Sequence, residues 1–146
     1  MLQSSNTNRD SYQSDLVNVA QQAMSNYAMC VRDAMDAAYE AGDKKLFEKN
    51  AKEFLGIIKD VDSIIATRPE LLIGAWIADA KKFGKNESER KFYEQNARNL
   101  LTTWGPKDNF LNDYANRNWA GLVGDYYYGR WNMFIIEVKA AMQANQ

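Results

Sequence analysis

The sequence lacks histidine altogether and contains a single cysteine, Cys30. Without histidine the chain cannot build a Ser-His-Asp or Cys-His triad, and it loses both the usual zinc ligand and the commonest general base. One cysteine cannot form an internal disulfide. Cys30 lies in an apolar helical register with Tyr27 and Val31, so we expect a small buried side chain, with a reactive thiol as the alternative.

The chain also lacks an excess of charge of either sign, because 18 basic residues nearly balance 19 acidic ones and the net charge is −1. This balance gives no electrostatic reason to expect nucleic acid, an acidic membrane surface or another polyanion as a partner. No apolar run approaches the roughly 20 residues that span a bilayer. The polar opening MLQSSNTNRD does not resemble a signal peptide, and we expect residues 1–11 to form a polar segment at a domain boundary; a targeting signal further upstream stays open.

Proline and glycine are sparse, with two and eight copies in 146 residues, and no segment alternates as a half-buried strand does. Apolar residues recur three and four positions apart instead. This spacing predicts an all-α domain over residues 12–146, a bundle of five or six helices whose first two form a long antiparallel hairpin. At this length one domain can bury a sizeable core without disulfides or metals.

Capping residues set the expected limits of these helices. Gly42 suits a C-cap, Asp43 an N-cap, Pro69 a first helical position, and Asn86 an N-cap with Glu89 three residues later. The predicted spans are residues 10–41, 43–66, 69–84, 86–104, 110–127 and 129–143, the last two joined by a bend or break near Gly129.

Asn86 also begins the tripeptide Asn-Glu-Ser, which matches a glycosylation acceptor. Three-residue matches are common by chance. We favour the N-cap interpretation.

Carboxylates are the remaining candidates for chemistry, since a glycoside hydrolase needs two of them about 5 to 10 Å apart. The closely spaced acids all fall where solvated helix faces are expected: Glu48 and Glu53, Asp60 and Asp62, Glu87 and Glu89. The sequence GLVG at 121–124 lacks the lysine and preceding strand of a phosphate loop. We therefore predict no catalytic residue, no metal ligand and no cofactor within this chain.

Aromatic residues are concentrated near the C-terminus: nine of 18 lie between positions 104 and 134. Trp131 and Phe134, three apart on the last helix, are expected in the core, and Trp119 also suits a core position. Trp104 stands at a helix end and Tyr114 in the first turn of the next helix, beside several asparagines. Apolar faces with polar tips can serve either a core or a sugar-binding surface, and composition leaves the two open.

The same segments carry a family resemblance. ATRPELLIGAWIADAK, FYEQNARNLLTTWGP and LNDYANRNWAGLVGDYYYGRW, in this order, resemble the C-terminal helical domain of the α-N-acetylglucosaminidases, glycoside hydrolase family 89. The resemblance extends more loosely back through DLVNVAQQAMSNYA. It covers nearly the whole chain after about residue 12.

The resemblance implies a parent enzyme that is exo-acting and retaining and that removes terminal α-linked N-acetylglucosamine from glycans. Its two catalytic glutamates lie on a (β/α)₈ barrel that this sequence does not contain, so this chain alone is expected to be inactive. The resemblance further implies a secreted, periplasmic or lysosome-like parent.

In this family the C-terminal domain contacts the barrel and helps to wall the substrate cleft, through the segment matching WGPKDNFLNDYA. Trp104 and Tyr114 would then contact the terminal sugar, with Phe110 as a weaker third. Arg98 and Arg130 resemble motif arginines that serve as structural charge partners. The alternatives from other classes are a stand-alone carbohydrate-binding module and a helical protein-interaction domain.

Overall fold

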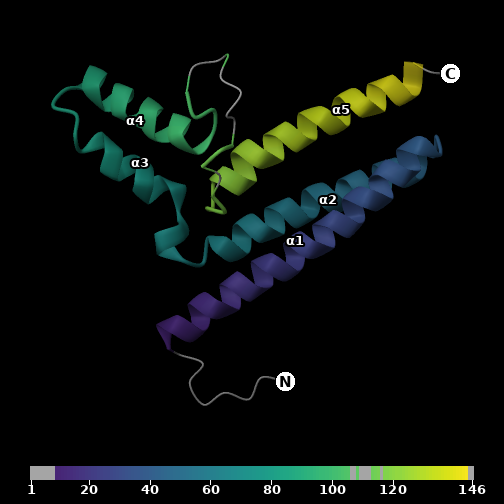
Figure 1. The fold of residues 1–146 in the computed structure, drawn as a ribbon, viewed down its shortest axis with the longest axis horizontal. Coiled ribbons are helices and arrows are strands. Elements are labelled where there is room, and N and C mark those ends of the chain that lie inside the picture. The colour runs from purple at the N-terminus through teal and green to yellow at the C-terminus, as the bar shows by residue number, and fades with distance from the viewer. Residues whose placement is uncertain (1–8, 106–107, 109–112, 116, 145–146) are drawn as a thin grey trace.

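The computed structural model describes residues 9–105, 108, 113–115 and 117–144, and these residues fold into five α-helices without a strand. In chain order (Figure 1) the helices are α1 (Asp10–Glu40), α2 (Lys44–Ile65), α3 (Ile73–Lys81), α4 (Glu87–Leu101) and α5 (Tyr128–Ala144). A 3₁₀ turn, η1 (Pro69–Leu71), precedes α3, and a π-helix, η2 (Leu122–Tyr127), precedes α5. The all-α prediction is confirmed.

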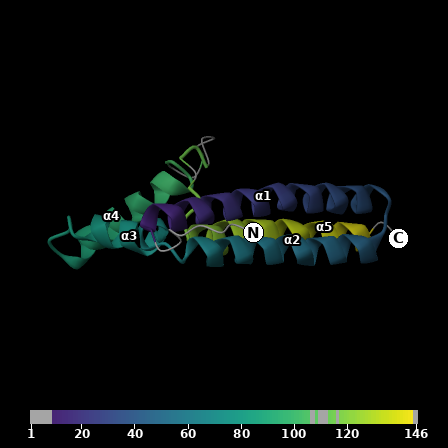
Figure 2. The ribbon, with the colours of Figure 1, turned by 90° about the horizontal axis from the view of Figure 1, so that it is seen from below.

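The long hairpin formed by α1 and α2 is also confirmed, with the predicted caps. Gly42 takes a φ of 67°, a left-handed conformation that glycine adopts without strain, and ends α1. Asp43 then starts α2, because its side chain accepts a hydrogen bond from the Leu46 amide at 2.9 Å. The two helices run side by side in Figures 1 and 2.

The main hydrophobic core lies between α1, α2 and α5. Its buried residues are Val31, Met35, Ala38, Phe47, Ala51, Phe54, Ile57, Val61, Ile65, Ala120, Val123, Ile135 and Met142. On α1 the buried positions are Val31, Met35 and Ala38, so the predicted register is confirmed at Val31 and wrong at Tyr27, which is exposed. Cys30 is also exposed, so the prediction of a buried side chain is wrong. Alanines occur at neighbouring positions along α1, and they leave its apolar stripe ambiguous by about one residue.

The predicted helix over residues 110–127 is wrong for most of its described part. Residues 113–115 and 117–121 form turns and extended chain, and Ala120 pairs with the segment before α3 through the bonds Ala120 N to Leu71 O and Ile73 N to Ala120 O. Helix begins only at Leu122, as the π-helix η2, and α5 follows directly at Tyr128. The predicted bend or break near Gly129 thus corresponds to the change from π-helix to α-helix one residue earlier.

Helices α3 and α4 form a second, separate hairpin. Asn86 caps α4 by accepting the Glu89 amide at 2.9 Å, while the Glu89 carboxylate reaches back to the Lys85 amide at 2.7 Å, so the N-cap interpretation is confirmed. These two helices contact each other far more than they contact α1, α2 or α5. Figures 1 and 2 show them projecting from the end of the bundle opposite the C-terminus.

Among the described residues, no helix combines the length and the apolar character needed to cross a bilayer.

Candidate functional site

The connection after α4 is held by two residues with left-handed backbone. α4 ends at Leu101, three residues before the predicted limit, and the Trp104 amide turns back to donate to the Asn99 carbonyl at 2.6 Å with φ of 59°. Asp113 has φ of 60°, and its amide donates to the Thr102 carbonyl at 2.7 Å. Positive φ is unfavourable for a residue other than glycine, so surrounding contacts must maintain both positions.

These two backbone turns bring Trp104 and Tyr114 together. Their ring centroids are 5.1 Å apart with an interplanar angle of 53°, although ten residues separate them in sequence. Trp104 is 36% exposed and Tyr114 is 69% exposed, so neither belongs to the core. Tyr114 lies in a turn rather than in the first turn of a helix as predicted. We refer to Trp104 and Tyr114 as the aromatic pair. Phe110, the predicted third member, lies outside the described residues.

An ion pair fixes the base of the aromatic pair. Arg130 of α5 donates to the carboxylate of Asp113, the residue before Tyr114, and its guanidinium lies 5.4 Å from the ring centroid of Tyr126. The hydrogen bond with Asp113 raises the pKa of Arg130. Arg98 pairs with Glu94 at 2.7 Å on α4. Both arginines therefore serve as charge partners within the chain, as expected.

A pocket of about 430 Å³ opens next to this ion pair. It is lined by Asp113, Tyr127, Arg130, Trp131 and Phe134. The Tyr127 hydroxyl is buried and has no hydrogen-bond partner among the described residues, and this burial raises its pKa. The pocket combines aromatic side chains with polar atoms, a combination suited to a neutral polar ligand or to a contacting protein segment.

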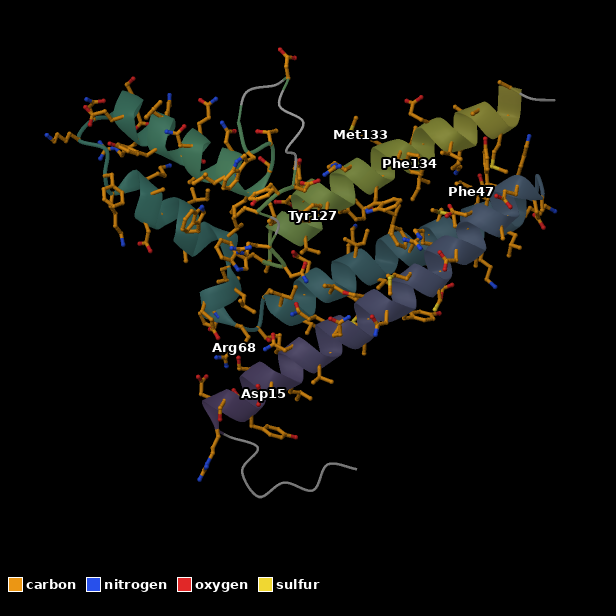
Figure 3. The ribbon with its side chains drawn as sticks, in the orientation of Figure 1. Asp15, Phe47, Arg68, Tyr127, Met133 and Phe134 are labelled. Carbon is orange, nitrogen blue, oxygen red and sulfur yellow. The ribbon has the colours of Figure 1, made fainter. Side chains whose placement is uncertain are left out.

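The core predictions for the neighbouring aromatics hold only in part. Trp131 packs against the core, with its ring edge-on to Phe54 at 4.7 Å between centroids. Phe134 is 52% exposed, so its prediction is wrong: the inward face of α5 carries Trp131, Ile135, Val138 and Met142. Figure 3 shows Phe134 and Met133 together on α5.

Trp119 is half-buried outside the main core. Its ring lies 5.8 Å from that of Trp76 on α3, and the Trp76 indole donates to the Ala97 carbonyl of α4 at 3.1 Å. Trp119 thus joins the second hairpin to the bundle. Its assignment to the bundle's core was wrong because residues 117–121 are not helical.

Sequence reasoning missed Asp62, which it assigned to a solvated helix face. Its carboxylate accepts the amides of Gly121 and Gly124 at 2.8 and 2.7 Å and so caps η2. A Cβ on Gly124 would lie 2.6 Å from this carboxylate. The amides of the two glycines in GLVG therefore bind an anion, which is the carboxylate of Asp62 in the same chain. The spacing of these glycines is the sequence feature that could have indicated this contact.

The carboxylates near the site are paired with donors of this chain. Asp62 and Asp113 each accept a hydrogen bond from a donor of this chain, and Glu94 also pairs with Lys81 at 2.9 Å. Within the described ranges, no group of three or more metal-ligating side chains is present. Around the aromatic pair, the described residues offer exposed aromatic rings and the ion pair between Asp113 and Arg130 as contact surfaces.

Comparisons with known proteins agree with this architecture. Residues 1–146 match the family model described as the α-N-acetylglucosaminidase C-terminal domain. The human α-N-acetylglucosaminidase is 34% identical over 122 residues, a match that covers 83% of this chain and 16% of the human protein.

Two solved structures of the family 89 glycoside hydrolase from Clostridium perfringens are each 36% identical to this chain, with a TM-score of 0.90. One is a complex with 2-acetamido-1,2-dideoxynojirmycin; the other is a variant in complex with its substrate, GlcNAc-α-1,4-galactose. Each match covers 94% of this chain and 16% of the clostridial one, so the chain spans about a sixth of the length of these relatives. The chain belongs to the family of α-N-acetylglucosaminidase C-terminal domains, within glycoside hydrolase family 89.

Proposed function

We propose that this chain is the non-catalytic C-terminal domain of a glycosidase that removes terminal α-linked N-acetylglucosamine. In this proposal the domain packs on the catalytic (β/α)₈ barrel of its parent, and the aromatic pair forms part of the wall of the substrate cleft. Phe110 is the third proposed wall residue, and the parent acts in a secreted, periplasmic or lysosome-like setting.

The observation that carries the proposal is the exposed contact between Trp104 and Tyr114. These two large rings lie at the surface and do not contribute to the core of this domain. Left-handed backbone at Trp104 and at Asp113 holds them together. A sugar ring presents apolar C–H faces and polar edges, and an indole beside a phenol offers matching surfaces. The family relationship supplies the sugar: the clostridial relative binds GlcNAc-α-1,4-galactose.

The ion pair between Asp113 and Arg130 supports the same role. It connects the turn carrying Tyr114 to α5, which is anchored in the main core through Ile135 and Met142. A contact surface works best when its side chains are fixed before the ligand arrives, because ordering them during binding costs free energy. The ion pair thus ties the turn that carries Tyr114 to a helix of the main core.

The purified chain tests the proposal against a stand-alone carbohydrate-binding module, which the same exposed rings could also serve. N-acetylglucosamine is titrated while tryptophan fluorescence is recorded, with an aryl α-N-acetylglucosaminide assayed in parallel. One wall of a cleft predicts no saturable change below about 10 mM, a Kd that corresponds to roughly 3 kcal/mol, and no hydrolysis.

A saturable change in the micromolar range that Trp104→Ala abolishes would instead identify a binding module. Reproducible hydrolysis by the chain alone would overturn the non-catalytic assignment. The gene sequence distinguishes the proposal from a helical protein-interaction domain without a sugar role, because the proposal requires the open reading frame to continue upstream into a barrel.

A further inference from the structure

Helices α3 and α4 enclose an apolar groove that stays open to solvent. The groove has a volume of about 230 Å³ and is lined by Trp76, Asp79, Ala80, Phe83, Tyr93, Asn96, Ala97 and Leu100. Its large side chains are exposed: Phe83 by 73%, Leu100 by 43%, Trp76 by 39% and Tyr93 by 37%. A contiguous exposed apolar surface of this kind often marks an interaction site.

The hairpin lacks the support that the other helices have. α3 has 9 residues and α4 has 15, lengths at which isolated helices are marginal in water. Neither helix contributes a residue to the main core cluster. Their connection to the bundle runs through the bonds between Ala120 and the start of α3 and through the rings of Trp76 and Trp119.

The groove leads directly to the aromatic pair. Tyr93, Ala97 and Leu100 follow one face of α4 at spacings of four and three residues. Leu100 ends this row, and the chain then turns so that the Trp104 amide bonds to the Asn99 carbonyl one residue before Leu100. A protein segment that contacts Trp104 and Tyr114 therefore lies next to the Leu100 end of the groove.

The start of α1 lies at the same end of the molecule as the hairpin. Arg68, whose side chain is only 11% exposed, pairs with Asp10 in the first turn of α1 at 2.8 Å and with Glu70 of η1 at 2.5 Å. Figure 3 shows Arg68 beside the first turns of α1, and η1 leads into α3. In a protein where this domain is C-terminal, the rest of the chain precedes α1 and arrives beside the hairpin.

We propose that the groove between α3 and α4 is the docking surface for the catalytic part of the parent chain, which inserts apolar side chains between Phe83 and Leu100. This inference rests on the proposed function, because that function supplies the occupant. The matched relatives contain about six times the length of this chain, so most of their mass lies outside the matched region. The surface that this mass covers starts at Trp104 and continues along the hairpin.

Site-specific photo-crosslinking in the full-length parent tests the docking directly. p-Benzoylphenylalanine is introduced in place of Phe83 and, as a matched control, in place of Leu46, which is 43% exposed at the far end of the bundle. After irradiation, crosslinked peptides are identified by mass spectrometry. The exposed positions of both side chains make either replacement compatible with folding.

We expect the position of Phe83 to crosslink to peptides of the catalytic part within the same molecule, with a yield at least tenfold above that of the control. Crosslinks to a second copy would overturn the proposal in favour of self-association. The absence of crosslinks to the catalytic part, or equal yields at the two positions, would also overturn it.

The crosslink is formed without substrate, so it separates the docking from the proposed contact with sugar. If the crosslink forms and Trp104→Ala leaves hydrolysis unchanged, the docking stands and the cleft-wall function fails. If Trp104→Ala impairs hydrolysis and the crosslink is missing, the function stands and the docking groove is wrong.

Discussion

The bundle of α1, α2 and α5 and the hairpin of α3 and α4 differ in how completely they bury their largest apolar side chains. The bundle buries Met35, Phe47 and Ile65 almost completely, at 0 to 2% exposure. The hairpin leaves Phe83 and Phe92 exposed by 73% and 59%. The bundle packs three helices around one core, whereas α3 and α4 pair mainly with each other. The deepest burial of large side chains therefore lies in the bundle.

The described part of the connection at 102–121 stands between these two regions and shares features of both. Ala120, near its end, is buried in the core and paired to the segment before α3, whereas the aromatic pair is exposed. Two polar anchors add to this core contact: Asp62, which bonds the Gly121 amide, and the Asp113 and Arg130 pair. The comparison therefore predicts different consequences for substitutions in the core, in the anchors and in the hairpin.

Truncating a core side chain of the bundle gives the largest expected loss. Phe47 is 2% exposed between α1 and α2, so Phe47→Ala should lower the free energy of unfolding by about 3–5 kcal/mol through lost burial and a cavity. Urea denaturation of the purified chain measures this. Leu46→Ala, one residue away and 43% exposed, is the control and should cost less than about 1 kcal/mol. Equal losses would mean that the bundle is not the stabilising core.

Removing the cap of η2 gives the next largest effect. Asp62→Ala leaves the amides of Gly121 and Gly124 without their acceptor, which should cost about 2–3 kcal/mol because both hydrogen bonds are to a charged group. Thermal denaturation measures the loss. Asp60→Ala, on the exposed side of the same helix, should change stability by less than about 0.5 kcal/mol. A similar loss for both variants would contradict the capping role.

Breaking the anchor of the aromatic pair should act locally. Arg130→Gln removes a partly exposed ion pair and should lower global stability by only about 1 kcal/mol. The Asp113 amide, bonded to Thr102, should nevertheless exchange with solvent at least tenfold faster, because its left-handed backbone loses support. Hydrogen exchange resolves this amide. Arg98→Gln removes a pair on α4 and should leave exchange at Asp113 unchanged; faster exchange in both variants would refute a specific anchor.

The smallest expected effect is a pH dependence in the hairpin. Hydrogen bonds from Lys81 and Arg98 hold the pKa of Glu94 below its ordinary value of 4.5. A depressed folded pKa means that the stabilisation is present above the ordinary value and is lost as the pH falls through the folded pKa.

Between pH 5 and pH 2, Glu94→Gln should therefore show a slightly shallower fall in Tm than the unsubstituted chain. Glu137→Gln, at an exposed position of α5, provides the comparison and should leave the slope unchanged. A steeper fall for Glu94→Gln would show that the carboxylate does not stabilise the hairpin.

The helical fold could be predicted because its signals are local. The Gly42, Asp43 and Asn86 caps act within a few residues, and the apolar spacing of α2 is strict. The failures have a different cause. Residues 113–121 carry helix-compatible spacing, but Asp62, about 60 positions away, satisfies the amides of Gly121 and Gly124, and Ala120 pairs across the chain to Leu71. Such long-range partners are not encoded in local periodicity.

The site shows the same division. The aromatic identity of Trp104 and Tyr114 could be read from the sequence, and their role at a sugar stays a prediction of the family resemblance. Their direct ring contact depends on two left-handed turns that spacing does not reveal. The predictions that Phe134 and Cys30 are buried failed because helical periodicity identifies the buried face only when its register is unambiguous. Large aliphatic residues fixed the register of α2, and alanines left that of α1 open.

The most direct test of the account is the kcat/KM of the full-length parent on an aryl α-N-acetylglucosaminide. Losing the indole contact at a sugar should cost about 1.5–3 kcal/mol, which lowers kcat/KM of Trp104→Ala by about 10-fold to 150-fold. Trp104→Phe should recover most of this loss, and Tyr39→Ala, an exposed aromatic of α1, should have none. If Trp104→Ala keeps kcat/KM within about twofold of the unsubstituted enzyme at unchanged Tm, the aromatic pair is not part of the substrate cleft.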